Sequence, residues 1–94
     1  MKFIMIVLIF FFSITKLSLA DKYEKGLLAA QNEEYLTAFK LWKPLADKGD
    51  KYAQNGMGML YHLGHGVKRD HLKASNWFHL SADQGLLAPM FHLG

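Results

Sequence analysis

Apolar side chains recur three and four positions apart between residues 21 and 85, which is the spacing of one face of an α-helix. The pattern predicts four short helices, at about residues 21–31, 34–48, 50–63 and 70–84. No stretch alternates apolar and polar residues, and Val67 is the only valine after residue 20, so a β-sheet is not expected. The second predicted helix has the clearest apolar face, formed by Tyr35, Ala38, Phe39, Trp42, Leu45 and Ala46.

Glycines and one aspartate mark the predicted helix ends. Gly49 and Gly85 each follow a helix, at the place where a left-handed residue commonly ends one. Gly64 and Gly66 interrupt the chain after the third helix, and we expect positive φ angles there. Asp70 stands where its side chain can cap the first turn of the fourth helix.

The second and fourth predicted helices repeat at an offset of 36 residues. Fixed periods of about 20–50 residues are typical of solenoids, in which each helix pair covers apolar surface of the next pair. Small residues in the repeat are expected to let helix axes approach, while aromatic residues fill the wider spaces. The identical pairs join Ala38, Ala46, Asp47, Gly49 and Gly58 to residues 74, 82, 83, 85 and 94, and Trp42 is matched by Phe78.

Residues 53–85 resemble the Sel-1-like repeat, a relative of the tetratricopeptide repeat. The matching features are Ala53-Gln54, Gly58, Leu60-Tyr61, Gly64, Gly66-Val67, Asp70, Lys73-Ala74, Trp77, Ala82 and Gly85. Residues 23–49, which include the run from Trp42 to Ala46, look like the first repeat of exported bacterial members. Ser81 departs from the pattern at a position where an alanine is usual, and so does Pro89.

The resemblance implies an all-α fold, a right-handed α-α superhelix of about two helix-turn-helix repeats with a truncated third. The repeat units would span about residues 21–49 and 50–85, followed by a stub at 86–94. The motif positions would have structural roles: Trp42, Gly49, Ala53, Gly58, Tyr61, Gly64, Gly66, Ala74, Trp77, Ala82 and Gly85.

Residues 1–20 differ from the rest of the chain. Lys2 precedes an unbroken apolar run at residues 3–12, and Ser18-Leu19-Ala20 supplies small residues for cleavage after Ala20, so the segment is predicted to be a secretory signal peptide. A membrane-spanning helix needs about 20 apolar residues, whereas this run ends before Lys16. We therefore expect a mature domain at residues 21–94 that is exported, periplasmic or secreted, and not held in a membrane after cleavage.

Removing the signal peptide also changes the charge balance. The whole chain has 11 Lys and Arg against 8 Asp and Glu, and Lys2 and Lys16 belong to the signal, so nine basic residues remain against eight acidic ones. No run of Lys and Arg indicates a nucleic-acid surface. The chain has no cysteine, which excludes a thiolate metal site.

The histidines and serines of the chain are the candidates for metal binding and for catalysis. His62, His65 and His71 cluster near the predicted glycine turn, but no cysteine or defined carboxylate completes a ligand set, so neither a metal nor a cofactor is expected. Ser75 and Ser81 lie within predicted helices without a nucleophile elbow, so no catalytic residue is assigned. Cysteine-rich relatives of this repeat family have been associated with β-lactams, and this chain lacks their cysteines.

The sequence thus favours an exported, non-enzymatic adaptor that binds another protein of unknown identity. Two alternatives stay open: a small exported hydrolase acting on β-lactam or cell-wall substrates, and a remnant of a longer repeat array. Charged residues such as Lys43 are expected on a solvated outer face. The aromatic and methionine residues are expected in the core: Trp42, Met57, Met59, Tyr61, Trp77 and Phe78.

Overall fold

The structure is a computed structural model that describes residues 19–87 and consists there of helices and turns, with no strand. Its helices are α2 (Leu19–Gln31), α3 (Tyr35–Asp47), α4 (Lys51–Leu63) and α5 (His71–Asp83), each of 13 residues. The predicted all-α fold is confirmed. Most of the predicted signal peptide (1–18) and most of the predicted stub (88–94) lie outside the described residues.

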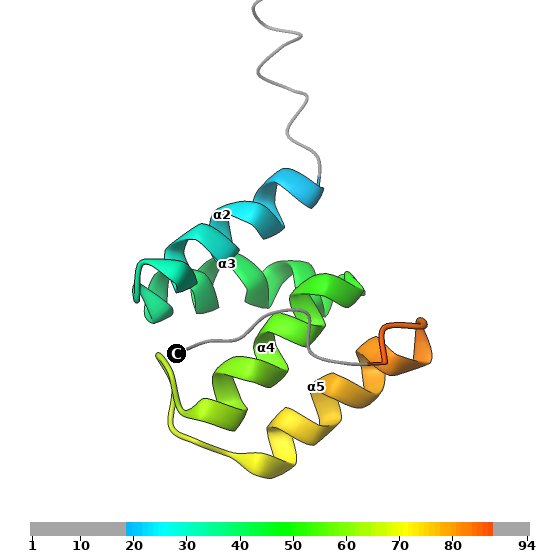
Figure 1. Ribbon diagram of the computed structural model, residues 1–94. Helices are drawn as coiled ribbons and strands as arrows, with labels where there is room; N and C mark the ends of the chain where they lie inside the picture. The colour runs from blue at the N-terminus through cyan, green and yellow to red at the C-terminus, as the bar shows by residue number, and fades with distance from the viewer. Residues whose placement is uncertain (1–18, 88–94) are drawn as a thin grey trace, which may run out of the picture.

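The helices form two hairpins, α2–α3 and α4–α5, and α4 packs against both α3 and α5 (Figure 1). This central position is reflected in the burial of α4, in which every residue from Ala53 to Leu60 is buried. Within the described part of the chain, no helix has the length and the apolar character needed to cross a membrane.

Aspartate side chains begin both helices of the second hairpin. The Asp70 carboxylate accepts a hydrogen bond of 3.0 Å from the Lys73 amide, as the sequence predicted. Asp50 does the same for the Tyr52 amide at 3.0 Å. Each cap satisfies one of the backbone N–H groups that the first turn of a helix leaves without an intrahelical partner.

The turn between α4 and α5 packs closely on the first hairpin. Gly64 and Gly66 have φ angles of 71° and 75°, in the left-handed region. A Cβ atom on Gly66 would lie 2.7 Å from the carbonyl carbon of Tyr35, so this glycine is required by both its conformation and the space available. The ring of His65 lies over the Tyr35 ring, with centroids 4.1 Å apart.

The core is organised around Trp42, which is fully buried. Its indole lies between two helical glycines, because a Cβ atom on Gly56 of α4 would be 2.6 Å from the ring and one on Gly26 of α2 would overlap it. The indole Nε1 donates a 3.0 Å hydrogen bond to the carbonyl oxygen of Tyr23, whose ring stacks on the indole at 5.7 Å. One side chain from α3 therefore connects α2 and α4.

The second hairpin repeats this arrangement on a smaller scale. A Cβ atom on Gly58 of α4 would be 2.6 Å from the ring of Phe78 on α5, just as Gly26 lies against Trp42. Small residues of the repeat were expected to let helix axes approach one another, and two of them in α4 are Gly56 and Gly58. In the structure the same residues make room for aromatic rings from neighbouring helices.

Buried polar side chains join the helix ends. The Ser81 hydroxyl is fully buried and donates a 2.8 Å hydrogen bond to the carbonyl oxygen of Lys51, at the start of α4. The Gln54 amide donates to the Ala46 carbonyl at 3.2 Å and accepts a 2.9 Å hydrogen bond from Gln84. The role of Gln54 was not predicted, and Ser81 was expected only to replace a packed alanine.

Candidate interaction surfaces

The contact between α3 and α4 shows how one helix pair holds the next. Phe39 of α3 meets Tyr61 edge to face, with ring centroids 6.2 Å apart. Trp42 is covered by Gly56, and the Ala46 carbonyl accepts the hydrogen bond from Gln54. Together with Tyr35, which contacts His65, these α3 residues form the face on which the second hairpin packs.

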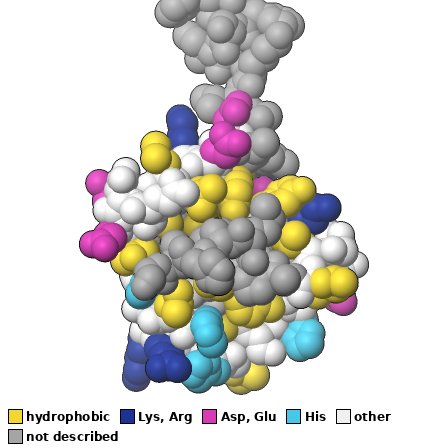
Figure 2. Space-filling model, viewed as in Figure 1, with side chains coloured by type: hydrophobic (Ala, Val, Ile, Leu, Met, Phe, Trp, Pro, Cys, Tyr) yellow, Lys and Arg dark blue, Asp and Glu magenta, His cyan; other side chains and the backbone are white. Residues whose placement is uncertain are grey.

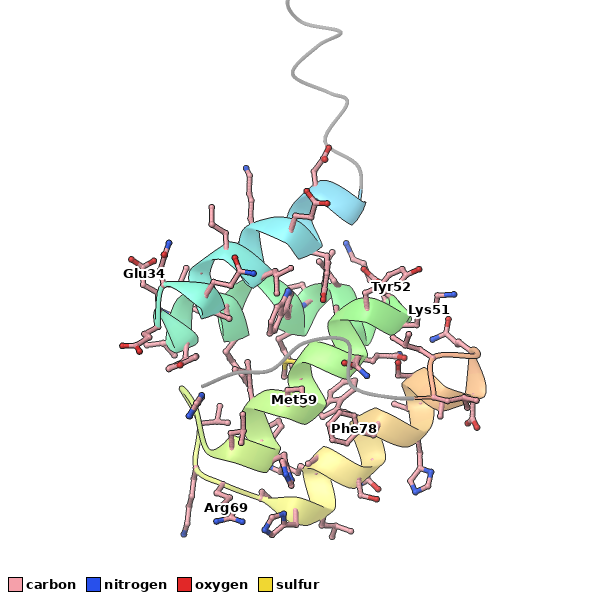
Figure 3. The ribbon with its side chains drawn as sticks, viewed as in Figure 1. Glu34, Lys51, Tyr52, Met59, Arg69 and Phe78 are labelled. Atoms are coloured by element: carbon pink, nitrogen blue, oxygen red, sulfur yellow. The ribbon has the colours of Figure 1, made fainter. Side chains whose placement is uncertain are left out.

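None of the described helices packs on α5 in the way that α4 packs on α3. The residues 36 positions after Tyr35, Phe39, Trp42 and Ala46 are His71, Ser75, Phe78 and Ala82, and all four line one groove of about 430 Å³. We call it the α5 end groove; its other lining residues are His62, Ala74, His79 and Leu87. Phe78 points from α5 toward α4 (Figure 3) and is only partly buried, whereas Trp42 is fully buried.

Histidines form much of the rim of the α5 end groove. The rings of His62 and His71 are 5.4 Å apart, and His79 lies further along α5. His65, which the sequence analysis grouped with them, instead lies against the Tyr35 ring at a tilt of 36°. Within residues 19–87, no three His, Cys, Asp or Glu side chains are grouped so that they could hold a metal ion.

The opposite side of the array is polar. Helices α2 and α4 correspond at an offset of 32 residues. The counterparts of four buried α4 residues are exposed on α2: Asp21, Glu24, Lys25 and Leu28. Figure 2 shows acidic side chains mostly over the first hairpin and histidines over the second. The two sides of the array therefore differ in chemistry: charged residues surround Leu27 and Leu28 on the α2 side, and histidines surround Phe78 on the α5 side.

A second groove lies where α3, α4 and α5 meet. It encloses about 340 Å³, and we call it the lysine–aromatic groove; it is lined by Lys43, Tyr61, Lys73, Asn76, Trp77 and Leu80. The Lys43 ammonium group of α3 is 5.9 Å from the centroid of Trp77, and that of Lys73 is 5.4 Å from the centroid of Tyr61. Each lysine thus reaches over an aromatic ring that belongs to a different helix.

This groove changes two expectations from the sequence. Lys43 does not extend from a fully solvated face, because it contacts Trp77 and forms an ion pair with Asp47 at 2.6 Å. Tyr61 and Trp77 are only partly buried, so the expected aromatic core is divided between a buried set and residues that line grooves. Burial depends on which helix covers a residue, and helical spacing alone does not give that.

The predicted motif residues fall into three structural groups. Trp42, Ala53, Gly58 and Ala74 are buried. The partly buried ones are Tyr61, Gly64, Trp77 and Ala82. Gly49, Gly66 and Gly85 are exposed at turns and have φ angles of 99°, 75° and 96°. Gly26 was not singled out from the sequence. It precedes Trp42 by 16 residues, whereas Gly58 precedes Phe78 by 20 residues. The two glycines nevertheless occupy equivalent places in their hairpins, because the α4–α5 turn is longer than the α2–α3 turn.

Tyr23 has a shifted pKa. Burial, followed by the nearby charge of Asp50 and the neighbouring Tyr52, raises the pKa of Tyr23 from 10.0 to about 12. The Tyr23 ring is stacked on Trp42 and lies in neither groove. The shift is therefore a consequence of core packing.

Comparison with known protein families matches the Sel1 repeat at residues 15–50 and again at 51–86. The chain belongs to the Sel1 repeat family. Sel1 repeats are helical modules that bind other proteins and are typically non-catalytic scaffolds. The family prediction is thus confirmed, while the exported bacterial type stays a prediction.

Among curated proteins, this Sel1 repeat chain is similar to the ERAD-associated E3 ubiquitin-protein ligase component HRD3A of Arabidopsis thaliana. The two are 32% identical over 81 residues, which is 85% of this chain but 12% of the plant protein. The chain therefore corresponds to a small part of that relative. No solved structure matches the chain.

Proposed function

We propose that this Sel1 repeat protein is an exported adaptor that binds a partner protein through the α5 end groove. The observation that carries the proposal is the correspondence between α3 and α5. The α3 face holds α4 inside the array, and the matching α5 face, with Phe78 in place of Trp42, lines a groove that none of the described helices fills. A surface that holds a helix in one repeat has the shape to hold another helix in the next.

The proposed occupant is a helix of the partner protein with a glycine over Phe78. The α3–α4 contact supplies the reason, because only a residue without a side chain fits over the Trp42 ring at position 56. The rim of the groove is more polar than the α3 face, since His71 and Ser75 replace Tyr35 and Phe39. The partner helix is therefore expected to combine a small apolar contact with polar flanks.

Two observations support the adaptor role and the export. The similar plant protein is described as a component of a ubiquitin-protein ligase, which is a role within an assembly. Residues 1–20 have the order of charge, apolar run and small residues that is typical of a secretory signal.

Export predicts that the protein isolated from its native cells begins at Asp21, which mass spectrometry of the intact chain would test. A chain that keeps residues 1–20 would contradict it.

Site-specific photocrosslinking tests the docking face. A photoreactive amino acid at Ser75, an exposed residue in the α5 end groove, should form a crosslink to a defined protein in the native cells. The same group at Thr37, which is exposed on α3 and lines neither groove, is the matched control. Equal products at both positions, or none at Ser75, would refute docking through this groove.

A further inference from the structure

The lysine–aromatic groove places two cations beside apolar surface that faces solvent. Lys43 and Lys73 come from different helices, and their ammonium groups lie 5.9 Å and 5.4 Å from aromatic centroids. Contact with a ring restricts a long lysine side chain and keeps its charge at the groove. Between them, Trp77 is partly buried and Leu80 is 48% exposed. The groove thus presents positive charge and an apolar contact together.

One of the two lysine charges at the groove has no ion-pair partner among the described residues. No acidic side chain is among the residues that line it. Lys43 is paired with Asp47, but Lys73 forms no ion pair within the described part of the chain. A ligand that brings a carboxylate to Lys73 would therefore gain a new charge interaction without breaking an existing one.

From this charge and this apolar surface, we propose that the lysine–aromatic groove binds an acidic peptide segment of a partner protein. An apolar side chain of the peptide lies on Trp77 and Leu80, and flanking carboxylates accept hydrogen bonds from Lys73 and Lys43. This inference rests on the protein-binding function proposed above, and it assigns a second surface with its own chemistry. The groove lies between α3 and α5, whereas the α5 end groove lies on the other side of α5.

A peptide accounts for the groove better than a nucleic acid does. Aromatic rings beside lysines also suit single-stranded nucleic acids, but those ligands need a basic track that follows several phosphates. Two lysines line this groove, and the chain after residue 20 has nine basic residues against eight acidic ones. Trp and Tyr with flanking charge are common anchors at protein interfaces.

Peptide binding to the mature protein tests the proposal directly. Fluorescence polarisation would compare the labelled peptide Asp-Glu-Leu-Phe-Glu-Asp with its amide counterpart Asn-Gln-Leu-Phe-Gln-Asn, and with a labelled oligothymidine. The acidic peptide should bind at least about 10-fold more tightly than the amide peptide, and its affinity should fall as salt is raised from about 50 to 300 mM. Equal binding of both peptides, no peptide binding up to about 1 mM, or preferred binding of the oligothymidine would overturn the proposal.

Matched variants locate the site. Lys73→Gln should lower the affinity for the acidic peptide about 3- to 5-fold. Lys40→Gln removes the same charge from an exposed α3 position outside the groove and should leave the affinity unchanged. Leu80→Glu should weaken binding further than Leu80→Lys, because both variants remove the apolar contact of the exposed leucine but add side chains of opposite charge. Equal effects of Lys73→Gln and Lys40→Gln, or of the two Leu80 variants, would contradict the assignment.

The two proposals fail separately. The crosslink at Ser75 should be unchanged in the Lys73→Gln protein if both surfaces act as proposed. A persistent crosslink without acidic-peptide binding would overturn the peptide groove and leave the adaptor function standing. Peptide binding that follows the Lys73 and Leu80 variants without any crosslink at Ser75 would overturn docking through the α5 end groove alone.

Discussion

Replacing Gly56 by alanine tests whether the Trp42 contact organises the array. At an exposed position inside a helix, replacing glycine by alanine stabilises the helix by about 1 kcal/mol. Here the new Cβ atom would lie 2.6, 2.8 and 2.9 Å from three atoms of the indole. The fully buried ring cannot move away without loosening its hydrogen bond to the Tyr23 carbonyl.

The expected magnitude combines three contributions. Overpacking of a core costs about 1–3 kcal/mol, and weakening the indole hydrogen bond costs about 1 kcal/mol more. The helix preference of alanine returns about 1 kcal/mol. The net loss is about 1–3 kcal/mol, which for a domain of this size lowers the melting temperature by about 4 °C or more.

Thermal and urea unfolding followed by circular dichroism would measure this change. Thr37→Ala is the control, since it raises helix propensity at an exposed α3 position without meeting a ring. A double-mutant cycle with Trp42→Phe adds a second test, because the nearest atoms to the new Cβ, Cε3 and Cζ3, belong to the six-membered ring of the indole. Gly56→Ala should cost about 1 kcal/mol less in the Phe background. A Gly56→Ala protein that melts at or above the wild-type temperature would refute the packing account.

Three further predictions concern individual residues. The pKa of Tyr23 is near 10 in the unfolded chain and about 12 in the folded protein, so its contribution to stability is present below pH 10 and is lost as the pH rises toward 12. The melting temperature of Tyr23→Phe should therefore fall less than that of the wild type between pH 10 and 12. An equal fall in both proteins would contradict the assignment. Ser81→Ala should lower the free energy of unfolding by about 1 kcal/mol in urea titrations, because the Lys51 carbonyl loses its donor, whereas a gain in stability would show that the hydrogen bond has no net value. Gly66→Ala should destabilise more than Gly85→Ala, since both have positive φ but only the first places a Cβ atom against backbone, and equal melting temperatures would argue against that contact.

Much of the local structure follows from the sequence because local signals determine it. The spacing of apolar residues placed the four helices within a few residues of their observed bounds. Asp70 was identified as a cap by its position before an apolar run, and Gly49 and Gly85 by their positions after one. Each of these signals acts within one helical turn, so no knowledge of the tertiary structure was needed.

The surfaces could not be predicted because they depend on contacts between distant residues. Trp42 and Trp77 were both expected in the core, yet Trp42 is fully buried by α2 and α4 whereas Trp77 lines a groove. Lys43 carries no sequence signal for its place over Trp77, 34 positions later. Gly26 was not identified from the sequence, because the turns in the two hairpins differ in length and its correspondence to Gly58 does not follow the 36-residue offset.

The two tryptophans give the protein built-in spectroscopic reporters. Trp42 is the centre of a contact among α2, α3 and α4, so its emission should shift only when that three-helix unit opens. Trp77 stands at the wall of a groove, where an occupant would change its access to a soluble quencher. Single-tryptophan variants would thus follow folding and occupancy as separate optical signals from one unlabelled chain.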